Sequence, residues 1–306
     1  MGDHERWVLP AGTAGADGWE TVVDDTREGW RHTGLRVATL APGESHAHAA
    51  EGLEAIVVPL SGRVSVRATD ATGVHEAELA GRADVFAGTT DVAYVGDGAQ
   101  LTVTAPEGAR VALALARVAP GSAPKPFRHL AAGEVPLELR GAGRASREVR
   151  NFGVPAVLDA DSIIACEVVT PAGNWSSFPP HKHDEERPGE ETELEEIYYF
   201  ELRAEDGSPG ESAGAEPVGY HRVYGTPDRP IDVLAEVRSG DVVLVPHGWH
   251  GPSMAPPGYD MYYLNVMAGP GAERAWLICD DPAHGWVRDT WQSQQVDPRL
   301  PMGGRS

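Results

Sequence analysis

The frequent interruption of apolar segments by glycine and proline is the feature that most constrains the fold. The 36 Gly and 25 Pro of this 306-residue chain separate short runs that are rich in Val, Ile, Tyr and Thr. These residues favour strands, and the turn formers between them favour tight connections. Helical periodicity is weak throughout. The sequence therefore predicts an all-β protein, with strands over residues 35–40, 55–60, 64–68, 111–118, 163–170, 197–202, 231–237, 242–245 and 261–267.

The two halves of the chain repeat one pattern. In each half a glycine precedes two histidines spaced i, i+2, and a glutamate then opens an apolar run. These residues are His46, His48 and Glu54 in the first half, and His181, His183 and Glu195–Glu196 in the second. Two similar β modules explain the length of the chain better than one large barrel. We expect an N-terminal module over 1–120, a connecting segment rich in Pro, Gly, Ala and Arg over 121–152, and a C-terminal module over 153–306.

Charge excludes some classes of partner. The chain has 25 Lys and Arg against 46 Asp and Glu, which gives a formal net charge of −21. Nucleic acids and anionic membrane surfaces are disfavoured, because phosphate binding needs a basic stripe. The first residues lack an apolar signal segment and no window approaches 18 apolar residues, so we expect a cytoplasmic protein. Homo-oligomers are compatible with these features.

The segment His181-Lys182-His183 is the strongest chemical signal. In an extended segment, residues i and i+2 project to the same face, so both imidazoles can reach one metal ion. A carboxylate would come from Glu195 or Glu196, which must point to opposite faces of one strand, and a later histidine from His247 or His250. Such a set suits a divalent Zn, Mn, Fe or Ni ion. The alternative is a polar loop with two solvated histidines.

Longer motifs carry a family resemblance. The segments PAGNWSSFPPHKHD (171–184), LEEIYY (194–199), VPHGWHGPS (245–253) and YYLNVMAG (262–269) resemble the 5-deoxy-glucuronate isomerase family, the bicupins of myo-inositol catabolism. That family is related to 4-deoxy-5-threo-hexosulose-uronate ketol-isomerase. The resemblance covers essentially the whole chain and implies two cupin-type jelly-roll modules. It also implies the metal ligands His181, His183, Glu196 and His250, with zinc as the first expectation. Loops 185–193 and 203–219 look longer than in the family, and His221 stands where glutamine is expected.

The resemblance implies an aldose–ketose isomerisation, from 5-deoxy-D-glucuronate to 5-dehydro-2-deoxy-D-gluconate. A proton leaves the carbon beside the aldehyde and another arrives on the aldehyde carbon, through an enediolate whose charge must be stabilised. A base would shuttle the proton, and His247, Glu195 and Lys182 are the candidates by proximity to the ligands. A hydride shift would need no base.

A sugar-acid substrate needs a local cation, since the net charge of the chain repels it. Arg222 is our candidate, because a guanidinium fork matches a carboxylate. The alternative interpretation is that Arg222 is an exposed arginine on a surface strand. Tyr262 and Tyr263 lie on opposite faces of a late strand, so one can line the pocket while the other packs outside; we take Tyr262 as the candidate.

The first module imitates the metal pattern incompletely. His46, His48 and Glu54 match its beginning, but no late histidine follows, so we predict a module without a metal. Two other functions fit the same features. One is a metal-dependent cupin dioxygenase, which would consume O₂, and the other is a non-catalytic bicupin that binds sugar acids.

Overall fold

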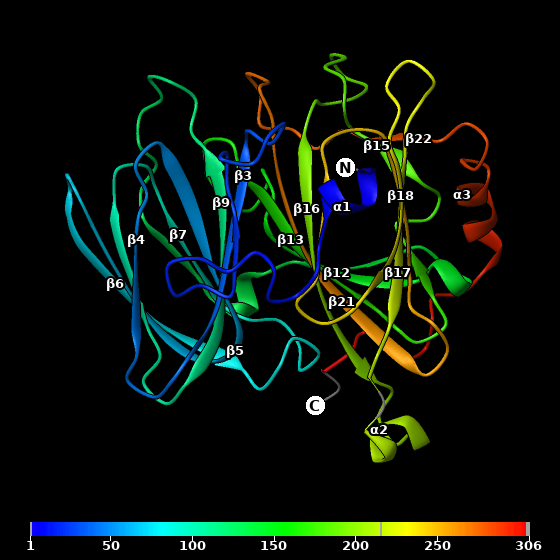
Figure 1. Cartoon of the computed structure of the whole chain (residues 1–306), viewed down its shortest axis with the longest axis horizontal. Helices are drawn as coiled ribbons and strands as arrows, with labels where there is room; N and C mark the ends of the chain where they lie inside the picture. The colour runs from blue at the N-terminus through cyan, green and yellow to red at the C-terminus, as the bar shows by residue number, and fades with distance from the viewer. Residues whose placement is uncertain (1, 215, 304–306) are drawn as a thin grey trace.

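The chain folds into antiparallel β-sheets, as a computed structural model that describes residues 2–214 and 216–303 shows (Figure 1). The all-β class predicted from the sequence is confirmed. Helical segments are short: α1 (Asp3–Trp7), α2 (Pro209–Ala213), α3 (Val287–Thr290) and the 3₁₀ turns η1 (Ala132–Glu134), η2 (Gly143–Ala145) and η3 (Trp291–Ser293). Across the described ranges, no helix is long and apolar enough to cross a membrane.

The N-terminal module is a nine-stranded sheet folded into two layers, on the left of Figure 1. One layer has the order β10-β7-β5-β9-β3-β2, and β5 then continues to pair with β6 and β8 in the other layer. The strands are β2 (Thr21–Val23), β3 (Thr33–Leu40), β4 (Ser45–Ala49), β5 (Leu53–Asp70), β6 (Gly73–Arg82), β7 (Val92–Val95), β8 (Gln100–Thr104), β9 (Ala109–Arg117) and β10 (Arg128–Leu130). The long β5 changes register at Gly62, whose φ of +78° suits glycine and lets one strand serve both layers.

The C-terminal module contains the other two sheets. The seven-stranded sheet has the order β1-β19-β16-β21-β13-β12-β11, with β1 (Val8–Leu9), β11 (Leu137–Arg140), β12 (Arg147–Gly153), β13 (Ile164–Thr170), β16 (Glu195–Ala204), β19 (Val242–Val245) and β21 (Tyr259–Ala268). The six-stranded sheet has the order β18-β17-β20-β15-β22, and β14 also pairs with β20. Its strands are β14 (Trp175–Ser176), β15 (His181–Lys182), β17 (Gly219–Tyr224), β18 (Asp232–Val237), β20 (Trp249–Met254) and β22 (Cys279–Asp280).

The segment predicted as a connection, 121–152, contributes strands to both modules. β10 pairs with β7 of the N-terminal sheet, whereas β11 and most of β12 form the edge of the seven-stranded sheet. The glycines and prolines of this segment lie at the ends of its short strands, and for this reason its composition resembles that of a linker. The N-terminal β1 also pairs with β19 of the C-terminal module.

Two hydrophobic cores explain how the modules are held together. On β9 the odd-numbered Val111, Leu113 and Leu115 belong to a core inside the N-terminal module. The even-numbered Ala112, Ala114 and Ala116 belong to a second core that continues through the C-terminal module. Because successive residues of a strand face opposite sides, this sheet is buried on both faces, and its small alanines let the neighbouring sheet approach closely.

The same alternation orients β16 of the C-terminal module. Glu196 and Tyr198 face a pocket inside this module. The side chain of Glu195 faces the N-terminal module instead, where its carboxylate accepts a hydrogen bond from the backbone N–H of Thr33. The fold thus directs Glu196, rather than Glu195, toward the pocket.

Candidate active site

Three buried histidines converge inside the C-terminal module. His181 lies on β15 and is the register partner of His250 on β20, and His183 follows at the end of β15. One ring nitrogen from each histidine lies within 4.8 Å of the other two, and among the described residues this is the cluster whose geometry suits a metal ion. Two strands of one sheet therefore hold all three imidazoles.

The backbone sets the orientation of two of these rings. The Nδ1 of His183 lies 3.1 Å from the carbonyl oxygen of Leu194, and the Nδ1 of His250 lies 3.1 Å from that of Gly248. A carbonyl only accepts hydrogen bonds, so the neutral rings carry their proton on Nδ1. Each Nε2 then faces the centre of the cluster, where its lone pair binds a metal ion in the neutral ring or its N–H donates to Glu196 in the protonated ring.

Glu196 completes the cluster. Its Oε2 lies 3.0 Å from the Nε2 of both His183 and His250. Burial raises the pKa of Glu196, but these two contacts outweigh burial and lower it to about 2. A carboxylate and two imidazole nitrogens meet here at hydrogen-bond distance, so either shared protons or a bound cation would satisfy all three groups. Three imidazoles and one carboxylate fit a divalent metal ion.

The remaining histidines of this region are kept neutral. Burial, followed by the neighbouring His250 and His183, lowers the pKa of His181 well below its usual value. His221 is also fully buried, and burial lowers its pKa to about 3. Its Nδ1 lies 2.7 Å from the Oγ of Ser253, and its ring packs against Tyr198. Neutral imidazole is the form that binds a metal ion.

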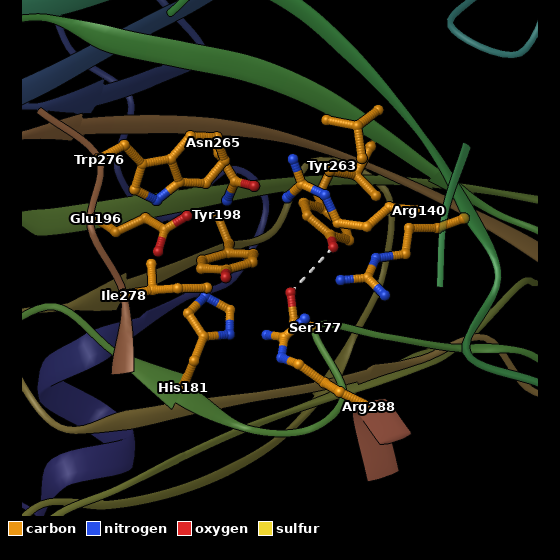
Figure 2. Close-up of a pocket in the computed structure, with 13 residues that line it drawn as sticks. Arg140, Ser177, His181, Glu196, Tyr198, Tyr263, Asn265, Trp276, Ile278 and Arg288 are labelled. Carbon is orange, nitrogen blue, oxygen red and sulfur yellow. Dashed lines mark hydrogen bonds between the residues drawn. The ribbon is translucent and has the colours of Figure 1, made fainter. Parts of the chain in front are cut away.

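A cavity of about 180 Å³ opens beside His181 and Glu196 (Figure 2). The hydroxyl of Tyr263 lies 3.0 Å from the Oγ of Ser176 and 3.2 Å from that of Ser177. Figure 2 shows Glu196 and His181 on one side of the cavity and Arg140 on the other. The lining consists of Arg140, Arg147, Val149, Val168, Ser177, His181, Glu196, Tyr198, Tyr263, Asn265, Trp276, Ile278 and Arg288.

The three candidate bases lie outside this lining. Lys182 points away from its histidine neighbours, and its Nζ donates to Asp184 at 2.6 Å and Glu191 at 2.8 Å. These ion pairs hold its proton and raise its pKa, against the effect of burial. Lys182 is therefore protonated and lies outside the lining of the pocket, so it is not suited to accept a proton there.

Glu195 and His247, the other two candidate bases, also lie outside the lining of the cavity. The Oε1 of Glu195 accepts hydrogen bonds from the backbone N–H groups of His32 and Thr33, both at 2.6 Å, so this carboxylate joins the two modules. His247 lies in the turn after β19. Burial, followed by the nearby Arg229, lowers its pKa. The turn directs His250 rather than His247 into the cluster.

Arg222 and Tyr262, the residues predicted to contact the substrate, are also absent from the lining of this cavity. Arg222 lies on the outer face of β17, where it pairs with Asp232 and donates to the carbonyl oxygen of Val233. Tyr262 faces the N-terminal module and donates to Glu167 at 2.6 Å. Tyr263 lines the pocket in its place, as the opposite faces of these two tyrosines allow.

Sequence reasoning missed the arginines of the pocket. Arg140 and Arg147 lie on β11 and β12, in the segment interpreted as a connection, and Arg288 lies on α3. The alternation of Arg147 and Val149 with Glu148 and Arg150 was the available signal, because it places the first pair on one face of a strand.

The first module uses its matching residues differently. Glu54 is fully buried and its Oε1 accepts hydrogen bonds from the backbone N–H groups of Ser162 and Ile163. The ring of His46 packs edge-on against Trp19, with ring centroids 4.9 Å apart. The carboxylate of Glu54 therefore stabilises the contact between the two modules.

Comparisons with known proteins agree with this architecture. A curated 5-deoxy-glucuronate isomerase of Geobacillus kaustophilus is 39% identical over 287 residues, covering 93% of this chain and 96% of the relative. The relative of the same name from Bacillus subtilis strain 168 is 38% identical over 254 residues, covering 83% and 86% of the two chains.

Solved structures match the fold over most of the chain. An IolB-like protein of Salmonella typhimurium superimposes with a TM-score of 0.79 at 32% identity, covering 92% of this chain and 98% of that one. The oxalate decarboxylase of Lactobacillus farciminis gives a TM-score of 0.61 at 13% identity, covering 90% and 88%, which is a likeness of fold alone. The predicted bicupin fold is thus confirmed. The model of the KduI/IolB family matches residues 8–287, and the chain belongs to this family.

Proposed function

We propose that this chain is a 5-deoxy-glucuronate isomerase that converts 5-deoxy-D-glucuronate to 5-dehydro-2-deoxy-D-gluconate with the help of one divalent metal ion. The observation that carries the proposal is the buried cluster of three histidines and Glu196 at the wall of a partly enclosed cavity with both polar and apolar lining. Relatives that align over more than nine-tenths of the chain have this activity as their name.

The ligands of the ion would be His181, His183, Glu196 and His250. Zinc is the first candidate, because a set rich in imidazole suits it, and Mn, Fe and Ni are compatible. When bound, such an ion supplies a Lewis acid that polarises neighbouring carbonyl and hydroxyl oxygens of a substrate. Its charge also exceeds that of the single carboxylate ligand, so the site as a whole favours an anion.

The protein's own hydroxyl groups provide directed hydrogen bonds around the reacting carbons. Burial raises the pKa of Tyr198 well above its usual value and raises that of Tyr263. Both phenols are therefore protonated at neutral pH and act as donors. Ser177 also lines the cavity and shares a hydrogen bond with Tyr263 (Figure 2). Donors aimed at a developing enediolate lower the barrier to its formation.

The enclosure of the cavity serves the same reaction. An enediolate that exchanges freely with solvent can be protonated at either carbon or lose a neighbouring group. Val149, Val168 and Ile278 contribute apolar walls that restrict water around the reacting atoms. In such surroundings the hydrogen bonds from tyrosine and serine are stronger than in water.

The test is to follow 5-deoxy-D-glucuronate by proton NMR with pure protein, with and without a chelator. We expect the aldehyde hydrate signals to be replaced by those of the 2-deoxy keto acid, and the chelator to stop the conversion. An oxygen electrode in the same reaction distinguishes a dioxygenase, which would consume O₂. Absence of conversion by protein loaded with each of the four metals would overturn the proposal.

A further inference from the structure

Three arginines converge on the cavity from different elements, and they differ in how their charge is balanced. Arg140 on β11 donates to both carboxylate oxygens of Glu138, at 2.9 and 2.7 Å. Arg288 on α3 makes a two-point contact with Asp280, with one of the two distances at 2.6 Å. Each of these guanidinium groups therefore has a dedicated carboxylate from the protein.

Arg147 is the exception. It is 5% exposed, and among the described residues no carboxylate lies within ion-pair distance of it. Among the described residues it donates one hydrogen bond, from Nη1 to the carbonyl oxygen of Ala145, at 3.1 Å. Its guanidinium also lies over the ring of Trp291, 5.6 Å from the ring centroid. One carbonyl and one aromatic face leave most of its five N–H donors free.

The position of Arg147 makes this imbalance costly. It is the register partner of Arg140 across the β11–β12 pair, so the two cations lie directly opposite each other. Like charges in that relation destabilise a sheet. Burial, together with Arg140 and Arg288, lowers the pKa of Arg147 to about 10, which still leaves it charged at neutral pH. Glu138 and Asp280 balance Arg140 and Arg288, and the carboxylate of the lining, Glu196, contacts the histidine cluster, so Arg147 has no carboxylate of its own.

We propose that Arg147 binds the carboxylate of the sugar-acid substrate and is the residue that selects acids over neutral sugars. This inference rests on the proposed function for the identity of the acid. The site requires an anion with two acceptor oxygens, and a carboxylate matches the fork of a guanidinium. The cavity that Arg147 lines also includes His181 and Glu196, so one small molecule can contact the arginine at one end and the metal cluster at the other.

The geometry assigns different tasks to the neighbouring arginines. Arg140 and Arg288 are already paired, so they supply the rim of the subsite and hold their own carboxylates away from the anion. Trp291 from η3 lies against both Arg147 and Arg288, with Arg288 at 5.1 Å from the ring centroid, and so fixes the two guanidinium groups relative to each other. The C-terminal segment thereby helps to build the acid-binding end of the cavity.

The experiment compares binding of D-glucuronate with that of its neutral amide, D-glucuronamide, by isothermal titration calorimetry on metal-loaded protein. The variants are Arg147→Met, which keeps the length of the side chain, and Arg147→Lys, which keeps its charge but loses the fork. Arg67→Met, an exposed site in the first module, is the control. Metal content and melting temperature are recorded for each protein.

We expect the wild type and Arg67→Met to bind the acid about 10- to 100-fold more tightly than the amide, which corresponds to one charge-assisted hydrogen-bonded pair. Arg147→Met should bind both alike, and Arg147→Lys should recover part of the preference. Arg147→Met should also melt at the same or a higher temperature, because a buried unpaired charge has been removed; a purely structural arginine would lower it.

Three results would overturn the assignment. The first is equal binding of acid and amide by the wild type, and the second is an undiminished preference for the acid in Arg147→Met. The third is a clear loss of stability in Arg147→Met that Arg147→Lys restores, with the preference for the acid unchanged in both variants. Failure of the proposed function has a different signature. In that case the wild type would not convert 5-deoxy-D-glucuronate, yet it would still prefer the acid to the amide in an Arg147-dependent manner.

Discussion

Glu54 and Glu195 make the same contact in opposite directions across the boundary between the two modules. Each begins a long strand of its own module and directs its carboxylate at the backbone just before a strand of the other. Glu54 accepts hydrogen bonds from the N–H groups of Asp161, Ser162 and Ile163, and Glu195 from those of Arg31, His32 and Thr33. The modules are thus joined by a reciprocal pair of buried carboxylates.

Strand register shows that these two glutamates are equivalent positions. Glu54 is the register partner of Ala116 on β9, and Glu195 is the partner of Ala268 on β21, the corresponding strand. The residue after Glu54 is Ala55, whereas the residue after Glu195 is Glu196. The first module therefore has an alanine where the second has its proposed carboxylate ligand, which the pattern of its histidines alone did not reveal.

Replacement of Glu195 by alanine should therefore destabilise the protein without removing a base. The change leaves the N–H groups of residues 31–33 without this acceptor; that of Thr33 is buried, and an unsatisfied buried group costs about 1–3 kcal/mol. We expect the free energy of unfolding, measured in urea, to fall by about 3 kcal/mol. The turnover number of the folded fraction should stay near that of the wild type.

A catalytic base at this position would behave in the opposite way. Its loss would lower the turnover number by about 10²- to 10⁴-fold and leave stability almost unchanged. Glu54→Ala is the matched variant, because it removes the equivalent contact from the module without the histidine cluster and should cost a similar free energy. Glu76→Ala, at an exposed ion pair, should change stability by less than about 1 kcal/mol.

Metal content provides a second prediction, of one ion per chain. His250→Ala removes one of three imidazoles, so we expect its metal content by mass spectrometry to fall well below that of the wild type, and turnover to fall by on the order of 100-fold or more. Treatment with a chelator should also lower the melting temperature, since an ion that binds only the folded state stabilises it.

The first module supplies the control for metal content. His48→Ala should leave both the stoichiometry and the turnover unchanged. Two ions per chain, or a loss of metal in His48→Ala, would contradict the assignment of the site to the second module.

The ligand types could be predicted from the sequence because strand alternation and the spacing of His181 and His183 restrict what one ion can reach. The choice of Glu196 over Glu195 was not available from alternation, since both faces of that strand are apolar. The orientation depends on how the two modules pack together. The face of β16 that meets the N-terminal module carries Glu195, and the face toward the pocket carries Glu196. Tertiary packing thus decided a question that local pattern left open.

The acid-binding end of the cavity was harder to predict for a related reason. Arg140 and Arg147 come from β11 and β12, short strands at one end of the sheet whose glycine- and alanine-rich surroundings resemble a linker, and Arg288 comes from a helical turn near the C-terminus. No local spacing connects these three residues. Arg222 is the candidate suggested by the match between a guanidinium fork and a carboxylate, yet the alternation of β17 directs it outward toward Asp232.

The adjacent tyrosines 262 and 263 give a paired prediction. Tyr263→Phe removes a hydroxyl of the pocket that bonds only to serines, so we expect turnover to fall about 10- to 100-fold and stability to fall by about 1 kcal/mol or less. Tyr262→Phe removes a buried donor to Glu167 beside Arg82, so stability should fall by about 2 kcal/mol while turnover is unchanged. Initial rates and urea unfolding of both variants check this. Equal effects of the two substitutions on turnover would contradict the assignment of Tyr263, rather than Tyr262, to the pocket face of β21.

His221 gives a prediction about stability in acid. Its pKa falls from 6.5 to about 3 on folding, chiefly through burial, so the unfolded chain takes up a proton below pH 6.5 that the folded chain refuses. Stability from this residue is complete above pH 6.5 and declines as the pH falls toward 3, with a slope of at most about 1.4 kcal/mol per pH unit. His221→Gln keeps an amide near Ser253 but cannot titrate. Urea unfolding of the metal-free proteins at pH 7, 6 and 5 should therefore show a shallower decline for the variant, and parallel declines would mean that His221 is protonated in the folded state.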